Sequence, residues 1–349
     1  MSLPRYTWQP TSAEIAAAAG IAIDEVERFD HNTSPFPTPW AVDVVSAAAS
    51  GLNEYPAASY ATLREAAATV RGVDPAWVVP GAGVDELILL AARAFLAPGD
   101  RSVAAEPTYP LYRIATAQSG AVWAPVQSAP PGFAFPSAEM ADASRTAAVT
   151  WLCIPANPVG NRPAAAEVAA VLAAAGGIVV LDAAYAEFAA DDWGEVVARQ
   201  PNVLALHTLS KAYGIGGARV GYAVGHPDLI AAIDGVRPPG SLASLSVQVA
   251  IAALADPQRM QHTVAELSAR RAGLASRLGA LGLRVLPSEA NFLLCEVGPN
   301  AHLVEDKLMA EGLVVRKFAT AGPLADYLRF TIRNDRAHDR LIDALERSL

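Results

Sequence analysis

Short apolar runs alternate with longer segments of helical periodicity between residues 75 and 250. Continuous apolar runs of this kind are typical of strands that are buried on both faces. Their alternation with helices predicts an α/β fold with a mainly parallel, doubly covered sheet, which binds ligands at the carboxyl ends of its strands. The predicted strands cover residues 77–79, 102–105, 147–152, 177–181 and 203–206, and the predicted helices cover residues 84–96, 109–119, 164–175 and 240–255.

The pattern changes near residue 256. A mixture of helical segments and separate apolar runs follows it, which predicts a smaller α+β C-terminal domain. The helical segments cover residues 257–281, 301–311 and the C-terminus, and the apolar runs cover residues 290–295, 313–316 and 327–332. We therefore expect an N-terminal arm, a large domain and a small domain, over residues 1–44, 45–255 and 256–349.

Composition and charge narrow the classes of function. The chain has 349 residues, of which 52% are hydrophobic and 17% charged, so it can bury a sizeable core. Its net charge of −9 argues against binding to nucleic acid or to anionic membranes. Cys153 and Cys295 lie in apolar runs without metal-ligand spacing, which predicts small buried side chains in a reducing compartment. With no signal-like or membrane-spanning run, we expect a soluble, cytoplasmic protein without a metal site.

Lysine is the rarest basic residue of the chain. Only three of the 26 basic residues are lysine, namely Lys211, Lys307 and Lys317. An amine of lowered pKa forms Schiff bases with aldehydes, which a guanidinium cannot do. Ser210 precedes Lys211, several glycines follow it, and Arg219 lies eight residues further on. This pattern suits a Schiff base with a phosphorylated aldehyde, and a solvated lysine in a Gly-rich loop is the alternative.

Polar residues follow the predicted strands. Asp182 ends an apolar run, where a buried carboxylate needs a cationic partner such as a protonated pyridine nitrogen, although an acid there can also cap a helix. Asn157 stands before a proline, which favours an extended backbone that aims its amide at the crevice, or a simple turn. The stretch 81–86 opens a helix with two glycines and predicts an anion site. The stretch 214–218 lacks the acidic residue of a dinucleotide-binding motif.

Taken in order, these motifs resemble fold-type I pyridoxal phosphate (PLP) enzymes, and most closely the histidinol-phosphate aminotransferase family. The likeness runs from about residue 30 to the C-terminus, and the combination of motifs is specific. The motifs are Tyr55-Pro56, Leu63-Arg64, Pro107-Thr108-Tyr109, Asn157-Pro158-x-Gly160, Asp182-x-Ala184-Tyr185, Thr208-x-Ser210-Lys211, Gly217-x-Arg219-x-Gly221, Ser288-x-x-Asn291-Phe292 and Leu328-Arg329-x-Thr331.

The resemblance implies a role for each matching residue at the cofactor. Lys211 binds the aldehyde of PLP and moves the proton of the substrate, while Asp182 keeps the pyridine nitrogen protonated. Tyr185 assists at the ring hydroxyl together with Asn157, and Tyr109 stacks on the ring. The resemblance further implies that the phosphate is held by Gly83, Val84, Asp85, Ser210 and Arg219.

The same resemblance implies partners and substrate contacts. Tyr55 reaches the phosphate in the site of the neighbouring subunit, so a homodimer with shared active sites is expected. Arg329 binds the acidic group of the substrates, Arg316 provides a second anion contact, and Asn32 contacts the substrate. The substrates implied are a small-molecule amino donor and a 2-oxo acid, with no nucleic acid or membrane partner.

Several positions depart from the family pattern. Ala183 replaces an acid, Ala156 replaces an asparagine, and residues 215–217 read Ile-Gly-Gly where Leu-Ala-Gly is usual. None of these changes removes an implied cofactor contact. The stretch His31 to Pro35 and Arg333 differ near the region that sets substrate specificity.

Three functions remain open at this point. The first is transamination between 2-oxoglutarate and histidinol phosphate or an aromatic amino acid, for which the resemblance is closest. The second is the reaction of a threonine-phosphate decarboxylase, a PLP lyase with the same catalytic residues and a different substrate pose. The third is PLP binding without catalysis, which the intact set of cofactor residues argues against.

Overall fold

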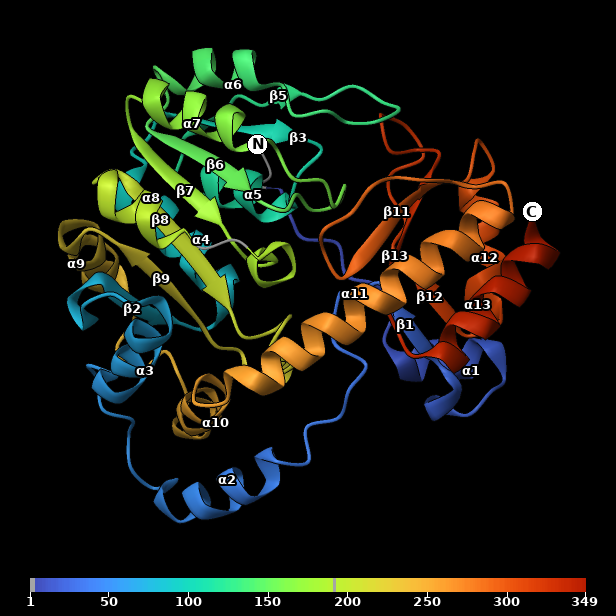
Figure 1. Ribbon diagram of the computed structural model, residues 1–349, viewed down its shortest axis with the longest axis horizontal. Coiled ribbons are helices and arrows are strands. Elements are labelled where there is room, and N and C mark those ends of the chain that lie inside the picture. The colour runs from blue at the N-terminus through green and yellow to red at the C-terminus, as the bar shows by residue number, and fades with distance from the viewer. Residues whose placement is uncertain (1–3, 191–192) are drawn as a thin grey trace.

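A central eight-stranded sheet dominates the computed structural model, which describes residues 4–190 and 193–349 (Figure 1). Its strands are β2 (Val78–Gly81), β3 (Arg101–Glu106), β4 (Val122–Trp123), β5 (Val126–Gln127), β6 (Val149–Cys153), β7 (Ile178–Asp182), β8 (Val203–Thr208) and β9 (Gly221–Gly225). The order is β2-β9-β8-β7-β6-β3-β4, and β5 pairs with β3. Strand β9 runs antiparallel to its neighbours β2 and β8, and the other described pairs are parallel. The predicted mainly parallel sheet is confirmed, and β9 is an addition that the sequence pattern did not indicate.

Helices cover both faces of this sheet, as predicted. Side chains alternate along each strand, so that Val180 packs into one apolar core while Val179 and Leu181 pack into another. The first core includes residues of α4 (Gly83–Phe95), α5 (Pro110–Gln118) and α9 (Pro227–Val236). The second includes residues of α3 (Ala61–Arg71), α6 (Ser137–Ser144), α7 (Ala165–Ala174), α8 (Gly194–Arg199) and α10 (Ser244–Leu254).

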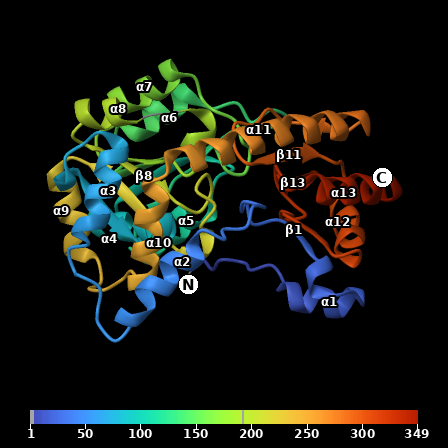
Figure 2. The ribbon, with the colours of Figure 1, turned by 60° about the horizontal axis from the view of Figure 1, so that its bottom comes forward.

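The C-terminal part forms a separate small sheet (Figure 1). Its antiparallel strands are β10 (Arg284–Val285), β11 (Phe292–Glu296) and β13 (Tyr327–Thr331), and its helices are α11 (Pro257–Ala280), α12 (Ala301–Ala310) and α13 (Asp335–Ser348). The start of the chain joins this part, because β1 (Glu27–Phe29) pairs in parallel with β12 (Leu313–Val315) and α1 (Ser12–Ala19) packs against α12. Figure 2 shows α1 and β1 beside the C-terminal helices. This pairing brings the residues after β1 close to β13.

The remaining elements are one helix and several short 3₁₀ turns. Helix α2 (Ala41–Ala48) lies at the edge of the molecule and packs against α10. The short 3₁₀ turns are η1 (Ile23–Glu25), η2 (Ala49–Gly51), η3 (Pro75–Trp77), η4 (Ala186–Ala189) and η5 (Gly216–Ala218). Within the described ranges, no helix combines the length and apolar character needed to cross a bilayer.

One predicted helix boundary was wrong. The helix expected over residues 240–255 begins at Ser244 instead. Pro238 and Pro239 disfavour helical backbone for the residues before them, and Gly240 has a φ of +67°. The chain therefore turns before the helix starts.

Candidate active site

A cavity of about 480 Å³ opens at the carboxyl ends of β6, β7 and β8, where Cys153, Asp182 and Thr208 line it. The small sheet and the N-terminal segment supply its other walls. Twelve of the fourteen predicted site residues line this cavity, and they are Asn32, Val84, Asp85, Tyr109, Asn157, Asp182, Tyr185, Ser210, Lys211, Arg219, Arg316 and Arg329. The strand-end polar residues of the sequence thus meet in one place.

The two remaining predicted residues lie outside the cavity wall. Gly83 has a φ of +82°, and a Cβ atom there would lie 2.8 Å from the Nη2 atom of Arg219. Glycine at this position therefore lets the start of α4 approach the guanidinium. Tyr55 lies in the segment between α2 and α3, and 96% of its surface is exposed.

Asp182 forms the buried floor of the cavity. Tyr112 donates its hydroxyl to Oδ2 at 2.5 Å, and the N–H of Ala184 donates to Oδ1 at 3.1 Å. Burial raises the pKa of Asp182 to about 6, although these two hydrogen bonds lower it. No basic nitrogen of the described residues lies within 4 Å of the carboxylate. A cationic group brought next to Asp182 would therefore be stabilised strongly.

Lys211 projects into the same cavity. Its Nζ donates to the carbonyl oxygen of His31 at 3.2 Å and lies 6.0 Å from the centre of the Tyr185 ring. Burial, together with the positive charges of Arg329 and Arg219, lowers the pKa of this amine to about 8. A substantial fraction of Lys211 is therefore neutral at slightly alkaline pH, as a nucleophile or base requires.

One end of the cavity is suited to a dianion. The first N–H groups of α4, at Gly83, Val84 and Asp85, have no acceptor within the helix, and the helix dipole favours negative charge there. Arg219 and the hydroxyl of Ser210 lie at the same end. Asp85 itself is engaged, since its carboxylate accepts from Arg219 Nη2 at 2.8 Å and from the Tyr109 hydroxyl at 2.9 Å.

Two guanidiniums form the opposite end. Arg329 donates from Nη1 to Asn157 Oδ1 at 2.5 Å and from Nη2 to the carbonyl oxygen of Asp30 at 2.7 Å. Its buried Nε has no hydrogen-bond partner among the described residues. Burial lowers the pKa of Arg329 to about 10, and the charge of Arg316 lowers it too, yet the group stays protonated at neutral pH. This end is therefore suited to an anionic ligand.

Asn32 and Tyr185 are linked in the wall of the cavity. The amide nitrogen of Asn32 donates to the Tyr185 hydroxyl at 2.9 Å, and its amide oxygen lies 3.0 Å from the Thr331 hydroxyl oxygen. Burial raises the pKa of Tyr185, so its hydroxyl keeps a proton to donate.

Two residues in or next to the cavity wall were not expected from the sequence. Tyr112, the partner of Asp182, lies three residues after Tyr109, and this helical spacing was the available signal. Tyr6 lies with its ring centre 6.5 Å from that of Tyr109 and 6.0 Å from the guanidinium carbon of Arg316, and nothing in the local sequence indicated it.

One sequence interpretation needs correction. Cys153 was expected to be buried, but it is half-buried and lines the cavity, while Cys295 is buried as expected. Nothing in the sequence indicated that the carbonyl oxygen of His31 accepts the hydrogen bond from Lys211.

Comparisons with known proteins agree with this geometry. The family described as aminotransferase class I and II matches residues 27–345. The histidinol-phosphate aminotransferase of Symbiobacterium thermophilum is 35% identical over 94% of this chain and 92% of its own. The crystal structure of histidinol-phosphate aminotransferase from Sinorhizobium meliloti in complex with pyridoxal 5′-phosphate has a TM-score of 0.88 and 27% identity, covering 98% of this chain and 95% of the other.

A solved structure of L-threonine-O-3-phosphate decarboxylase from Porphyromonas gingivalis is also similar. Its TM-score is 0.77 at 21% identity, over 91% of this chain and 98% of the other. That likeness shows a shared fold only.

Proposed function

The chain belongs to the class I and II aminotransferases, and we propose that it transfers an amino group between histidinol phosphate, or a related aromatic amino donor, and 2-oxoglutarate with PLP as cofactor. We assign this reaction to histidine biosynthesis. The observation that carries the proposal is the position of Lys211, an amine whose pKa is lowered to about 8, between a site for a dianion and a pair of arginines.

The residues present fit PLP. Asp182 is a buried carboxylate that gains a cationic partner when a protonated pyridine nitrogen lies beside it. The phosphate suits the start of α4 together with Ser210 and Arg219. Tyr109 offers its ring as a stacking surface. We assign the ring hydroxyl to Tyr185 and to the Asn157 amide nitrogen, because the Asn157 oxygen is already bound by Arg329.

Lys211 is the residue that handles the proton in this proposal. When bound, PLP supplies an aldehyde and an electron-withdrawing ring. The Lys211 amine would hold that aldehyde at rest. During turnover it would take the proton from the α carbon of the amino donor and, in the second half of the reaction, give a proton to the α carbon of the product formed from 2-oxoglutarate. Its lowered pKa keeps part of the amine neutral for this task.

The two arginines orient the substrates. We assign Arg329 to the acidic group of each substrate, which is the phosphate of histidinol phosphate or a carboxylate of 2-oxoglutarate, because its Nε remains available in a buried place. Arg316 stands beside it and offers a second guanidinium to the same group when that group is a phosphate dianion. Asn32 shapes this side of the cavity through Tyr185.

Two arginine variants should separate these roles. Arg329→Ala should raise KM by about tenfold or more for the amino donor and for 2-oxoglutarate alike, because a charge-assisted contact is lost in both. Arg316→Ala should raise KM more for phosphorylated than for unphosphorylated donors, because a dianion gains more from a second guanidinium. Steady-state kinetics on histidinol phosphate, histidinol and 2-oxoglutarate measure both effects. Equal effects of Arg316→Ala on the two donors would contradict its assignment.

We further propose that the enzyme acts as a cytoplasmic homodimer with shared sites. The segment from α2 to α3 exposes Val42, Leu52 and Tyr55, with 62%, 58% and 96% of their surfaces accessible. A cluster of exposed apolar residues supports an interface with a second copy. Tyr55 would then reach the phosphate in the site of the neighbour.

Mixed dimers test this role of Tyr55. A Tyr55→Phe subunit paired with a Lys211→Arg subunit should form one site with both lesions and one site with neither. Mixing the two variants should therefore restore activity toward that of a single intact site. If subunit exchange is verified and the mixture shows no gain over the separate variants, Tyr55 serves its own chain.

The reaction itself is tested by two readouts on one panel of donors. Phosphorylated and aromatic amino compounds are supplied with and without 2-oxoglutarate, and amine loss and CO₂ release are measured. We expect amine loss that depends on 2-oxoglutarate. Release of CO₂ without 2-oxoglutarate would instead identify a lyase of the threonine-phosphate decarboxylase type, and neither product would indicate PLP binding without catalysis.

A further inference from the structure

Three successive carbonyl oxygens of the segment Asp30 to Asn32 accept hydrogen bonds from side chains. The oxygen of Asp30 accepts from Arg329 Nη2 at 2.7 Å, and that of His31 accepts from Lys211 Nζ at 3.2 Å. The oxygen of Asn32 accepts from Asn291 Nδ2 at 2.9 Å. One short stretch of backbone therefore contacts both the reactive amine and the arginine assigned to the acidic group of the substrate.

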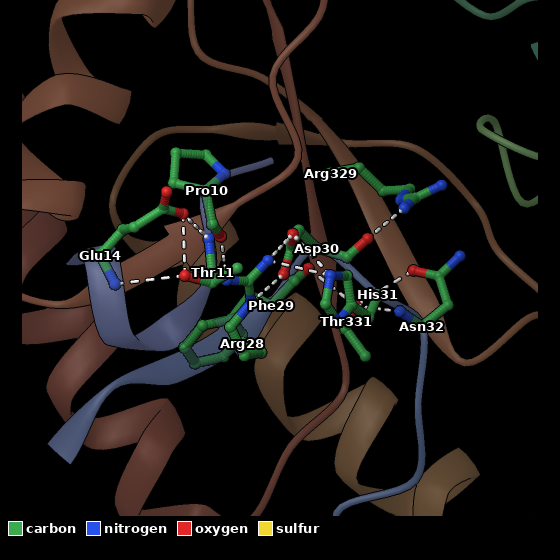
Figure 3. A network of polar contacts seen from close by, with 10 residues as sticks. All are labelled: Pro10, Thr11, Glu14, Arg28, Phe29, Asp30, His31, Asn32, Arg329 and Thr331. Carbon is green, nitrogen blue, oxygen red and sulfur yellow. Dashed lines mark hydrogen bonds and ion pairs between the residues drawn. The ribbon is translucent and has the colours of Figure 1, made fainter. Parts of the chain in front are cut away.

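An ion pair holds the beginning of this segment (Figure 3). Arg28 donates from Nε to Asp30 Oδ1 at 2.9 Å and from Nη2 to Oδ2 at 2.6 Å, and its Nη1 donates to the carbonyl oxygen of Pro10 at 2.6 Å. The Asp30 side chain is 1% exposed and that of Arg28 is 13% exposed. A bidentate pair that is so deeply buried fixes the position of Asp30, including its carbonyl group.

Thr331 on β13 holds both flanks of the segment. Its hydroxyl accepts from the N–H of Asn32 at 2.9 Å and donates to the carbonyl oxygen of Phe29 at 2.7 Å. Neither contact involves the carbonyl group of Asp30 or of His31 (Figure 3). Between these flanks, the bidentate ion pair with Arg28 holds the side chain of Asp30.

We propose that Arg28 and Asp30 are positioning residues for the transamination site. Their ion pair sets the carbonyl groups of Asp30 and His31, and these groups orient Arg329 and Lys211. The pair touches neither cofactor nor substrate and acts through the two side chains. This inference rests on the proposed function for its reaction, although its effect on ligand binding can be measured without turnover.

The charge of Asp30 fits this role. Burial lowers the pKa of Arg329, and the Asp30 carboxylate opposes that effect. Nearby, Nε2 of His31 lies 2.9 Å from Arg28 Nη2 and 3.3 Å from Asp30 Oδ2. Because a guanidinium can only donate, Nε2 of His31 accepts from Arg28, and the donors that face the carboxylate are Nε and Nη2 of Arg28. A neutral amide at position 30 would therefore be poorly matched.

Asp30→Asn is the first test, because it keeps the shape of the side chain and leaves no buried carboxylate unpaired. Its amide nitrogen would face the donors of Arg28, so the segment should shift. Succinate, an unreactive dicarboxylate, probes the acid site of the holoenzyme by calorimetry. We expect the Kd for succinate and the KM for 2-oxoglutarate to rise about tenfold, as for loss of a hydrogen bond to a charged group.

Three companion variants separate positioning from a loss of folding. Arg28→Lys keeps the charge but cannot form the bidentate contact, so it should give a smaller rise of the same kind. Arg277 lies away from the cavity and pairs with Asp339, with 2.8 Å between Nη1 and Oδ1. The variant Arg277→Met should therefore leave succinate binding unchanged. In an Arg329→Ala background, Asp30→Asn should have little further effect on binding, because the residue through which it acts is gone.

The outcomes distinguish this inference from the proposed function. If folded Asp30→Asn binds succinate as tightly as the unmodified enzyme, the inference is overturned. Full additivity of Asp30→Asn and Arg329→Ala would overturn it as well. If no donor is transaminated by the unmodified enzyme but Asp30→Asn still weakens succinate binding, the proposed function fails and the positioning role stands.

Discussion

Lys211→Arg should abolish transamination while the protein still folds and retains a positive charge in the cavity. Arginine can neither bond covalently to an aldehyde nor give and take a proton near neutral pH, so kcat should fall by about 10⁴-fold or more. Thermal unfolding of the variant should stay close to that of the unmodified protein. Turnover by stopped-flow and steady-state assays measures the loss.

Lys307→Arg is the matched control for this experiment. Lys307 Nζ donates to the carbonyl oxygen of Ser348 at 3.1 Å, a contact that arginine can also make, and Lys307 is not one of the residues that line the cavity. Its activity should stay within about twofold, as for most surface substitutions. Substantial residual activity in Lys211→Arg would remove Lys211 from the chemistry.

Asp182→Asn should also cause a large loss of activity, about 10²-fold or more in kcat, because charge stabilisation in a preorganised site is worth several kcal/mol. The side chain keeps its shape and can still accept the hydrogen bond from Tyr112. What disappears is the negative charge that keeps the pyridine nitrogen protonated. Activity near that of the unmodified enzyme would mean that Asp182 only caps the end of its strand.

The same substitution should stabilise the cofactor-free protein. The folded pKa of Asp182 is raised to about 6 from an ordinary 3.8, so its contribution to stability is present below pH 4 and lost as the pH rises through 6. Removal of this ionisation should raise the free energy of unfolding above pH 6 by about 3 kcal/mol, and should change it little below pH 4. Denaturant titrations at pH 4 and pH 8 measure whether Asp182→Asn raises the free energy of unfolding at the higher pH only. A gain in stability combined with a loss of activity marks a residue kept for function.

The sequence pattern predicted the sheet because buried strands are nearly continuous in apolar residues. Strands such as β7 and β8 could be placed in this way, whereas β9 could not, since Gly221–Gly225 is short and begins and ends in glycine. The helix before Leu254 was placed too early because its alanine and leucine content masked the turn at Gly240. The pattern of apolar residues was thus sufficient to place most helices and strands. The residue at which the helix before Leu254 begins was set by the backbone conformation around Gly240.

Many of the predicted cavity residues share a signal, because they follow a strand or open a helix. Arg329 lies inside β13 instead, and only the family resemblance indicated it. Asp182, Asn157 and Lys211 carry that signal in their own neighbourhood. Asp30 and Tyr6 do not, because their importance arises from contacts across some 300 residues of chain, such as that between Asp30 and Arg329. The pairing of β1 with β12 creates these contacts, and no local pattern encodes it.

The most direct test of the central claim is to find which lysine carries the cofactor. The purified protein should contain PLP bound through Lys211, and borohydride should fix it there irreversibly. Peptide mapping by mass spectrometry then compares the peptides that contain Lys211, Lys307 and Lys317. We predict the label on the Lys211 peptide alone, and a label on Lys307 or Lys317 with Lys211 unmodified would contradict the account.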